Sequence, residues 1–393
     1  MLRLRSFAPR SVFASLLLCL PGSAAVAAWA GCADELAPAA PAPVDASTGT
    51  DVSAPDASAD APKHECDDDR DESGIWKHLR CSGLYSSFAD KTVAPDAKPY
   101  KPGVEFWSDG AEKQRWVFLP AGSKIDISDF DEWKFPQGTK LWKEFKVGGK
   151  RIETRLFTKL PDDRWVHTSY RWNADETEAV NQGGGEKIAG IGLDGGPYEI
   201  PTAGQCDQCH RGKKDQVLGF DAESLGLATA TGQTLATLAA EGWLSAPPPK
   251  TSLAFPGTEL ASAAVGWIHA NCGACHNANP NASASYRKHF QVRATDLAPA
   301  DGGSPALEQL DIWTQAYCVD TFRPDPEAGA PYKYIRGGAP EKSLMSILAS
   351  RRAGPDEIPS TAVQMPPIVT RSVDQDGIAL VNAWITTLQP CGN

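Results

Sequence analysis

Apolar and polar residues alternate along the chain between about residues 73 and 200. Four runs, "QRWVFLP", "TKLWKEFKV", "KRIETRLFTKL" and "RWVHTSYRWN", interleave aromatic and β-branched residues with charged ones. The turn-forming sequences "PAGS", "PQGT", "VGGK" and "PDD" divide them. A period of two that is bounded by Gly and Pro predicts strands with one apolar side. We therefore expect an antiparallel sheet or barrel with one solvent-exposed face.

Helical periodicity replaces this alternation in the second half of the chain. Residues 223–244, "ESLGLATATGQTLATLAAEGWL", are rich in helix-forming residues, and "APPPK" follows them as a breaker. In "TELASAAVGWIHANCGACH", Leu260, Ala264 and Ile268 fall on one helical stripe that leads directly into Cys272. We expect a helix in both segments.

A last helix is predicted over residues 372–388, "SVDQDGIALVNAWITTL". Ser372 and Gln375 have the spacing of a capping box, and Val381 and Trp384 lie on an apolar stripe. The patterns together predict an α+β multidomain protein in which an antiparallel β-rich domain precedes an all-α domain. The expected parts are a β-rich domain at 66–200, a connecting segment at 201–250 and an all-α domain at 251–393.

The N-terminus has the layout of a secretory signal. Arginines precede the apolar run "SVFASLLLCL", and small residues follow it, so residues 1–31 are expected to be a signal peptide. The stretch "WAGC" resembles a bacterial lipobox, although Trp29 stands where that motif has an aliphatic residue. The resemblance implies lipidation of Cys32 and a membrane anchor, with ordinary cleavage in the Ala-rich run as the alternative. We expect an exported protein, in the periplasm or at the outer membrane as a lipoprotein.

The excess of negative charge is concentrated near the N-terminus. The chain has 38 Lys and Arg against 49 Asp and Glu, a formal charge of −11. Most of the excess acid lies between residues 32 and 73. Residues 32–65 are rich in Ala, Pro and Asp and predict a disordered acidic tether. The rest of the chain is nearly balanced, which excludes an electrostatic case for nucleic-acid binding.

The ten cysteines divide into groups. Cys19 lies in the signal and Cys32 in the lipobox-like stretch, while four more belong to a repeated motif. An exported protein meets oxidising conditions, so we expect the remaining four to form disulfides. The expected pairs are Cys66–Cys81 and Cys318–Cys391, with other pairings left open.

The repeated motif carries the clearest chemistry. "GQCDQCHRG" and "ANCGACHNA" each have the form Cys-x-x-Cys-His, which is the signature of c-type haem attachment. The two cysteines hold the porphyrin edge through thioethers and the histidine binds the iron. A zinc ribbon would need closer spacing of the two pairs and leaves the histidines unexplained, and a redox dithiol lacks its βαβ context. The sequence therefore predicts two haem c groups, the first in a haem-binding segment at 201–250 and the second in the domain at 251–393. Their expected ligands are Cys206, Cys209 and His210 for the first, and Cys272, Cys275 and His276 for the second.

A six-coordinate haem needs a second axial ligand. Met365 lies in "TAVQMPPIV", a loop stiffened by two prolines, and we expect it to bind the second haem. Met345 lies on a probable helix and is expected to pack in the core. The candidate sixth ligands of the first haem are His167, His269 and Met345, but a vacant or weakly held position is the leading expectation.

Residues 255–393 resemble the class I cytochrome c domain. The resemblance rests on a helix leading into "NCGACHN", then "GAPEKSLMSIL", "QMPP" and a final helix with "AWI". It implies that the first and last helices of this part cross beside the haem. The segment with "YCVDTF" and "YKYIRGG" is an insertion relative to a minimal cytochrome.

The preceding part resembles a family of bacterial diheme c-type cytochromes with an N-terminal β-rich domain. The matching stretches are "EFWSDGAEKQRWVFLPAG", "FPQGTKLWKEF", "IETRLF", "YRWNADETEA" and "CDQCH" followed by "VLGFDAESL". "FPQGTKLWKEF" is also similar to the sheet motif of cytochrome P460 and the β-type cytochromes c′. This second likeness implies that the first haem packs against the sheet.

The resemblances imply an exported diheme cytochrome that transfers electrons to or from a redox partner in the cell envelope. One alternative is a haem enzyme that acts on peroxide, nitric oxide or hydroxylamine at an open first haem. Another is a docking and electron-acceptor module for a quinoprotein dehydrogenase, with the β-rich domain as the docking part. The electron carrier is the favoured prediction.

Overall fold

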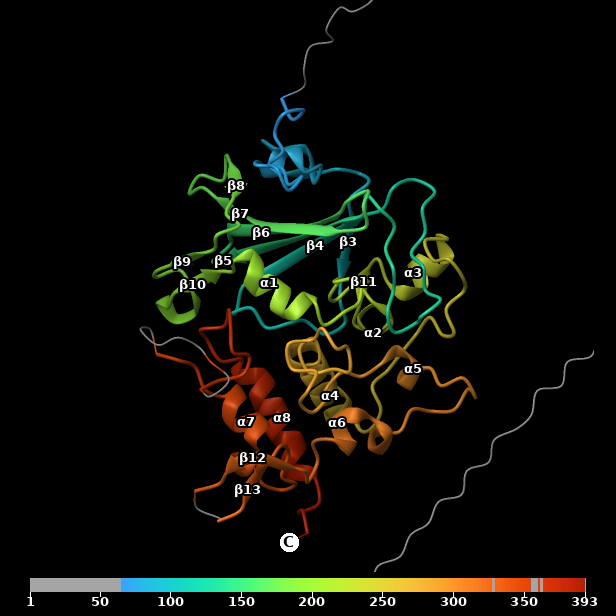
Figure 1. Ribbon diagram of the computed structural model, residues 1–393, viewed down its shortest axis with the longest axis vertical. Coiled ribbons are helices and arrows are strands. Elements are labelled where there is room, and N and C mark those ends of the chain that lie inside the picture. The colour runs from blue at the N-terminus through green and yellow to red at the C-terminus, as the bar shows by residue number, and fades with distance from the viewer. Residues whose placement is uncertain (1–64, 327–328, 355–359, 361–362, 393) are drawn as a thin grey trace, which may run out of the picture. The chain divides into compact units, whose positions relative to one another are not determined.

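A seven-stranded antiparallel sheet is the largest element of the fold. The computed structural model describes residues 65–326, 329–354, 360 and 363–392. The signal peptide, the tether up to residue 64 and the lipidation of Cys32 lie outside these residues. The strand order is β11-β3-β4-β5-β6-β7-β8 (Figure 1). The strands are β3 Lys98–Lys101, β4 Glu112–Phe118, β5 Lys140–Val147, β6 Lys150–Lys159, β7 Trp165–Trp172, β8 Ala179–Asn181 and β11 Thr231–Gly232.

The four alternating runs form β4, β5, β6 and β7, as predicted, but the expectation of a solvent-exposed face is wrong. One face packs Trp116, Trp142 and Leu156 against the N-terminal part of the chain. The other face carries Val117 and Phe157 into the main core. Several charged residues of the alternation are therefore buried: Arg115, Glu144, Glu153 and Lys159.

The segment 223–244 does not form one helix. It contains α2 (Ala222–Leu225), β11 and α3 (Leu235–Ala240). β11 interrupts the helical pattern because it pairs with the edge strand β3, Thr231 opposite Lys101. Thr234 then starts α3 by accepting a hydrogen bond from the Thr237 N–H.

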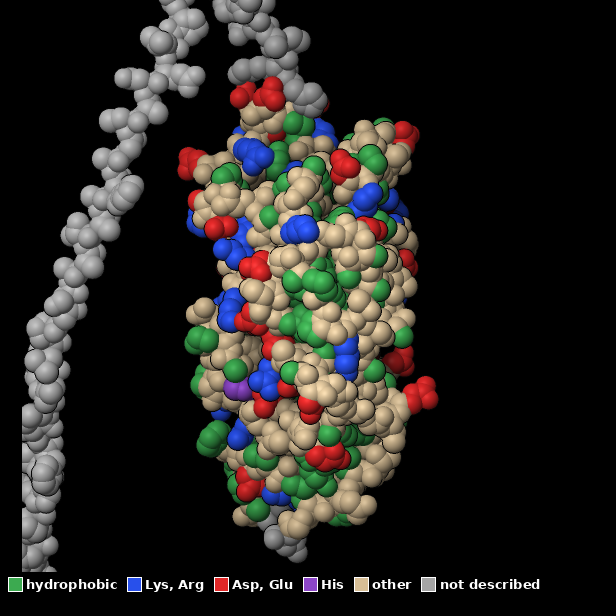
Figure 2. All heavy atoms as spheres, turned by 90° about the vertical axis from the view of Figure 1, so that its right-hand side faces the viewer, with side chains coloured by type: hydrophobic (Ala, Val, Ile, Leu, Met, Phe, Trp, Pro, Cys, Tyr) green, Lys and Arg blue, Asp and Glu red, His purple; other side chains and the backbone are tan. Residues whose placement is uncertain are grey.

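The surface carries both signs of charge. On the face drawn in Figure 2, Lys and Arg are intermingled with Asp and Glu. This mixture agrees with the nearly balanced composition of the chain after the tether. Among the described residues, no helix has the length and apolar character needed to span a membrane.

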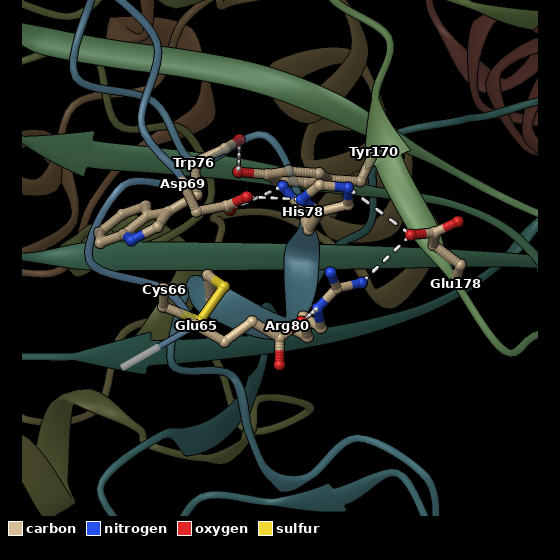
Figure 3. The surroundings of a disulfide bond; sticks show 9 residues. Glu65, Cys66, Asp69, Trp76, His78, Arg80, Tyr170 and Glu178 are labelled. Atoms are coloured by element: carbon tan, nitrogen blue, oxygen red, sulfur yellow. Dashed lines mark hydrogen bonds and ion pairs between the residues drawn. A yellow bond between two sulfur atoms is a disulfide. The ribbon is translucent and has the colours of Figure 1, made fainter. Parts of the chain in front are cut away.

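The N-terminal part of the described chain is fastened to β7 and the turn that follows it. A disulfide joins Cys66 to Cys81, one of the two predicted pairs (Figure 3). The Tyr170 hydroxyl donates to the carbonyl oxygen of Trp76 at 2.9 Å. Arg80 forms an ion pair with Glu178 at 3.1 Å. The other elements here are η1 Leu79–Cys81, β1 Tyr85–Ser87 and β2 Thr92–Val93.

The part after the sheet is not the all-α domain that the sequence predicts: its helices are separated by long irregular segments, and it also contains strands. A two-stranded antiparallel sheet of β12 and β13 lies in the predicted insertion. Just before it, Cys318 forms the second predicted disulfide, with Cys391 near the C-terminus. The elements are α4 Glu259–Cys272, α5 Ala294–Leu297, η3 Leu307–Gln309, α6 Asp311–Thr314, β12 Asp320–Pro324, β13 Pro331–Lys333, η4 Pro340–Lys342, α7 Leu344–Ala349 and α8 Gln375–Thr387.

The helices α4 and α8 pack side by side (Figure 1). Trp267 on α4 donates from its indole N–H to the Asp374 carboxylate at 2.7 Å. Asp374 is also the N-cap of α8, because its side chain accepts from the Gly377 N–H. The predicted capping box at Ser372 is therefore wrong, since the helix begins after Asp374.

Candidate haem-attachment site

The first Cys-x-x-Cys-His motif occupies the short helix α1, Ala203–His210. A capping box starts this helix, with Thr202 and Gln205 bonding each other's backbone N–H. β9 Glu186–Ile188, η2 Leu193–Gly195 and β10 Tyr198–Ile200 precede α1. The His210 ring stacks on Phe157 of β6, with ring centroids 4.0 Å apart. The first motif thus lies against the inner face of the sheet.

The second motif begins at the end of α4. Cys272 is the last residue of the helix, and its carbonyl oxygen accepts from the N–H groups of Cys275 and His276. These bonds continue the helical turn through the motif. The His276 ring stacks on Phe290 with centroids 4.8 Å apart. Each motif histidine therefore rests on a phenylalanine ring.

Both histidines are held through the same ring nitrogen. His210 Nδ1 lies 2.6 Å from the Gln216 carbonyl oxygen, and His276 Nδ1 lies 3.1 Å from the Lys288 carbonyl oxygen. A carbonyl can only accept, so Nδ1 carries the proton and the Nε2 lone pair is free. Burial lowers the pKa of His210 to about 3 and also lowers the pKa of His276, which favours neutral rings. This is the tautomer that metal-binding histidines use.

The two motifs contact each other although their sequences are far apart. The Sγ atoms of Cys209 and Cys275 are 4.0 Å apart. Cys275 Sγ also lies 3.6 Å from the Gln208 carbonyl oxygen. Gly212 permits this approach, because a Cβ there would lie 1.7 Å from the Ala274 carbonyl oxygen.

The four motif cysteines fit covalent haem attachment. They are free, while the four other described cysteines form disulfides. Burial raises the pKa of Cys206 to about 11 and of Cys272 to about 12, which favours neutral thiols at these two positions. The hydrogen bond with Cys209 lowers the pKa of Cys275. In the described part of the chain, no three His, Cys, Asp or Glu side chains gather to hold a bare metal ion. Free thiols beside a histidine with an available Nε2 match the donor set of a haem c.

His167 lies near the first motif but is poorly placed to be its sixth ligand. Its ring stacks on the other face of Phe157, 4.6 Å between centroids, so Phe157 separates it from His210. Two axial ligands must instead face each other across the porphyrin. His167 Nε2 lies 3.2 Å from the Ala203 carbonyl oxygen.

The other two candidates for that position are also engaged. His269 Nδ1 accepts from the Val292 N–H at 3.0 Å, so the neutral ring carries its proton on Nε2 and has no lone pair left for iron. Met345 is buried in the main core. His269 and Met345 are therefore not free ligands. His167 keeps a buried Nδ1 without a hydrogen-bond partner in the described part of the chain, but Phe157 lies between its ring and His210.

Met365 lies in the loop between α7 and α8 and is half-buried. Its N–H donates to the Leu348 carbonyl oxygen at 3.0 Å. The buried side chain of Gln364 holds the loop by accepting from the Ala353 N–H at 2.7 Å and donating to the Pro366 carbonyl oxygen at 2.8 Å. The loop is therefore braced by hydrogen bonds as well as by its prolines.

A buried acid and base lie beside both motifs. Lys213, three residues after His210, places its ammonium group 3.3 Å from the Glu223 carboxyl group, and Glu223 is fully buried. Both side chains line a hollow that also touches His269 and Gly273. Burial raises the pKa of Glu223 to about 8.

Sequence reasoning missed the groups that orient the motif. Phe157 and Phe290 have ordinary strand and loop contexts, so nothing in the chain marks them as stacking partners. The carbonyl groups of Gln216 and Lys288 carry no sequence signal, because every residue has a backbone carbonyl group.

Comparisons of the chain with protein-family models, with curated proteins and with solved structures found no match.

Proposed function

We propose that the protein is an exported diheme c-type cytochrome that transfers electrons in the cell envelope. The observation that carries the proposal is the pairing of two free Cys-x-x-Cys-His motifs whose nearest sulfur atoms, on Cys209 and Cys275, are 4.0 Å apart. The two disulfides support an oxidising compartment. A redox partner protein and a lipid anchor at Cys32 belong to the same proposal.

In this proposal the chain supplies attachment, orientation and burial. Haem iron, when bound, provides reversible one-electron chemistry. Cys206 and Cys209 would hold one haem and Cys272 and Cys275 the other, each through two thioethers. The carbonyls of Gln216 and Lys288 would fix the two iron-binding histidines and increase their basicity.

Contact between the motifs supports electron exchange within the molecule. Gly212 and Ala274 touch through their backbones, so the two attachment sites are in direct contact. The Met365 loop, braced by Gln364, is the proposed source of the second haem's thioether ligand. In the proposal, residues 251–393 form a cytochrome c-like domain in which α4 and α8 pack together.

A haem enzyme is the second candidate. The observation that favours it is that His269 is engaged, Met345 is buried in the main core and His167 is separated from His210 by Phe157. An open axial position at His210 would let a small ligand reach the iron.

Spectroscopy of the protein produced in a periplasm with haem-attachment machinery separates the two candidates. Two low-spin haems that ignore added cyanide support the electron carrier. A high-spin component that responds to cyanide or nitric oxide, and that disappears in the Cys206→Ala/Cys209→Ala variant, supports the enzyme. Absence of any haem spectrum contradicts both.

A further inference from the structure

Three basic side chains form one cross-strand row on the sheet face that carries the first motif. Arg115 on β4 is opposite Lys143 on β5, and Lys143 is opposite Arg155 on β6. Ser169 on β7 continues the row opposite Arg155. Like charges that face each other on neighbouring strands repel, so an unneutralised row of this kind is destabilising.

Carboxylates neutralise only part of this charge. Arg115 Nη2 pairs with Glu105 at 2.9 Å, and Lys113 shares that carboxylate at 3.6 Å. Arg155 forms two hydrogen bonds with Glu153, at 2.6 and 3.0 Å. Glu105 is shared further with Lys101, at 3.2 Å. Five basic side chains therefore surround the two carboxylates of Glu105 and Glu153: Lys101, Lys113, Arg115, Lys143 and Arg155. The basic groups outnumber the acidic ones.

The row also has unused hydrogen-bonding capacity. Among the described residues, Lys143 has no carboxylate partner, and its ammonium nitrogen lies 5.5 and 5.2 Å from the ring centroids of Phe106 and Phe145. Arg115 is 4% exposed and Ser169 is 2% exposed. Arg115 Nη1 and Ser169 Oγ are both buried without a hydrogen-bond partner in the described part of the chain. Buried polar atoms of this kind point to a missing acceptor.

The row lies beside His210. Arg155 and Phe157 are on the same face of β6, two residues apart, and Phe157 stacks on His210. Lys143 and Arg155 act electrostatically on both His210 and Cys209. Arg155 keeps 21% of its side chain exposed in the middle of the sheet, and Lys143 is also partly exposed, so both can accept a further partner.

We propose that the row Arg115–Lys143–Arg155 is a carboxylate-binding site that holds the two propionates of the haem attached at Cys206 and Cys209. The assignment rests on the proposed function. The basic side chains outnumber the carboxylates around the row, and guanidinium groups match carboxylate geometry. Ser169 adds a neutral donor at the end of the row. The alternative ligand of this row is a free oxoanion bound beside the haem, which would present similar negatively charged oxygen atoms.

The test uses the full chain with attached haem whose propionate carbons are labelled with ¹³C. Infrared difference spectra between the oxidised and reduced protein identify the propionate bands by their isotope shift. We expect Lys143→Gln and Arg155→Gln each to move the labelled bands. The midpoint potential of one haem should also fall, because a cation beside the iron is lost.

A matched control is Lys146→Gln, on the same strand but the opposite face, where Lys146 pairs with Glu144 at 3.4 Å. It makes the same charge change and should leave the labelled bands in place. Lys143→Gln breaks no ion pair, so it should fold even if Arg155→Gln does not. Labelled bands that stay unmoved in Lys143→Gln, with two haems attached, overturn the assignment.

Titration of the unmodified holoprotein with nitrite and with sulfate tests whether the row binds a free oxoanion instead of the propionates. No saturable response is expected, because propionates already occupy the row. Saturable binding that Lys143→Gln abolishes would overturn the propionate assignment in favour of a free oxoanion. A mass spectrum without haem would defeat the proposed function itself, and is therefore distinguishable from either result.

Discussion

The Sγ atoms of Cys209 and Cys275 lie 4.0 Å apart, although one belongs to α1 and the other follows α4. The contact predicts how the apoprotein oxidises. In Cys206→Ser/Cys272→Ser, the two remaining motif thiols have each other as neighbours. We expect oxidised glutathione to convert them to a disulfide, with two glutathione thiols released.

The matched control is Cys209→Ser/Cys275→Ser, which leaves Cys206 and Cys272. It should form the bridge at least ten times more slowly, because proximity sets the rate of the closing step. Alkylation followed by mass spectrometry counts the free thiols in each variant. Equal rates in the two variants would show that the motifs do not meet as described.

Gly377 is required for the contact between α4 and α8. A Cβ at this position would lie 2.0 Å from the Trp267 indole nitrogen. We expect Gly377→Ala to destabilise the protein by about 1–3 kcal/mol, as overpacking does. Urea unfolding measures the change. Gly204→Ala is the control, because a Cβ at Gly204 in α1 meets no atom within 4 Å, and it should be neutral or slightly stabilising.

Lys159 fastens the end of β6 to the loop that holds His210. Its ammonium group donates to Asp215 at 2.8 Å and to the Phe135 carbonyl oxygen at 2.9 Å, and it is 2% exposed. Lys159→Met leaves Asp215 without its buried cation, so we expect a loss of about 3–5 kcal/mol. Urea unfolding of Lys150→Met, on the exposed start of the same strand, is the control. A loss below about 1 kcal/mol for Lys159→Met would contradict the buried pair.

Glu223 predicts a pH dependence of stability. Its pKa is about 8 in the folded protein against 4.5 for the ordinary group, so the folded state binds its proton more tightly. Stability is then fully retained below about pH 4.5 and falls as the pH rises toward 8. We expect Glu223→Gln to remove a fall on the order of 1–3 kcal/mol between pH 5 and 9.

Thermal unfolding across that pH range measures the difference between the variant and the wild type. The exposed Glu308→Gln is the control and should follow the wild-type curve. A wild-type curve parallel to that of Glu223→Gln would show that Glu223 titrates normally.

Local patterns predicted those parts of the fold that local forces determine. The period of two located β4 to β7, and the apolar stripe ending at Cys272 located α4. These local patterns failed where contacts with segments distant in the sequence determine which residues are buried or which residue caps a helix. The charged residues of the alternation, such as Arg115, are buried because other segments cover both sheet faces. Asp374 displaced Ser372 as the cap because it also accepts from Trp267 on another helix.

In the candidate site, too, local features could be predicted from the sequence and long-range contacts could not. The motif residues were readable from spacing alone. The two expected disulfide pairs are the ones that the structure forms, although the sequence left other pairings open. The contact of Cys209 with Cys275 was not, because nothing in either motif encodes its neighbour. The ring stack that places Phe157 between His167 and His210 arises from strand pairing and helix docking together.

The intact mass of the protein produced in a periplasm that attaches haem tests the central claim most directly. If the protein is a diheme cytochrome, the mass of the wild type increases by two haems. Cys206→Ala/Cys209→Ala and Cys272→Ala/Cys275→Ala should each carry one haem, and the variant lacking all four cysteines none. A wild-type protein without haem would contradict the proposal of a diheme cytochrome, and so would motif variants that carry as much haem as the wild type.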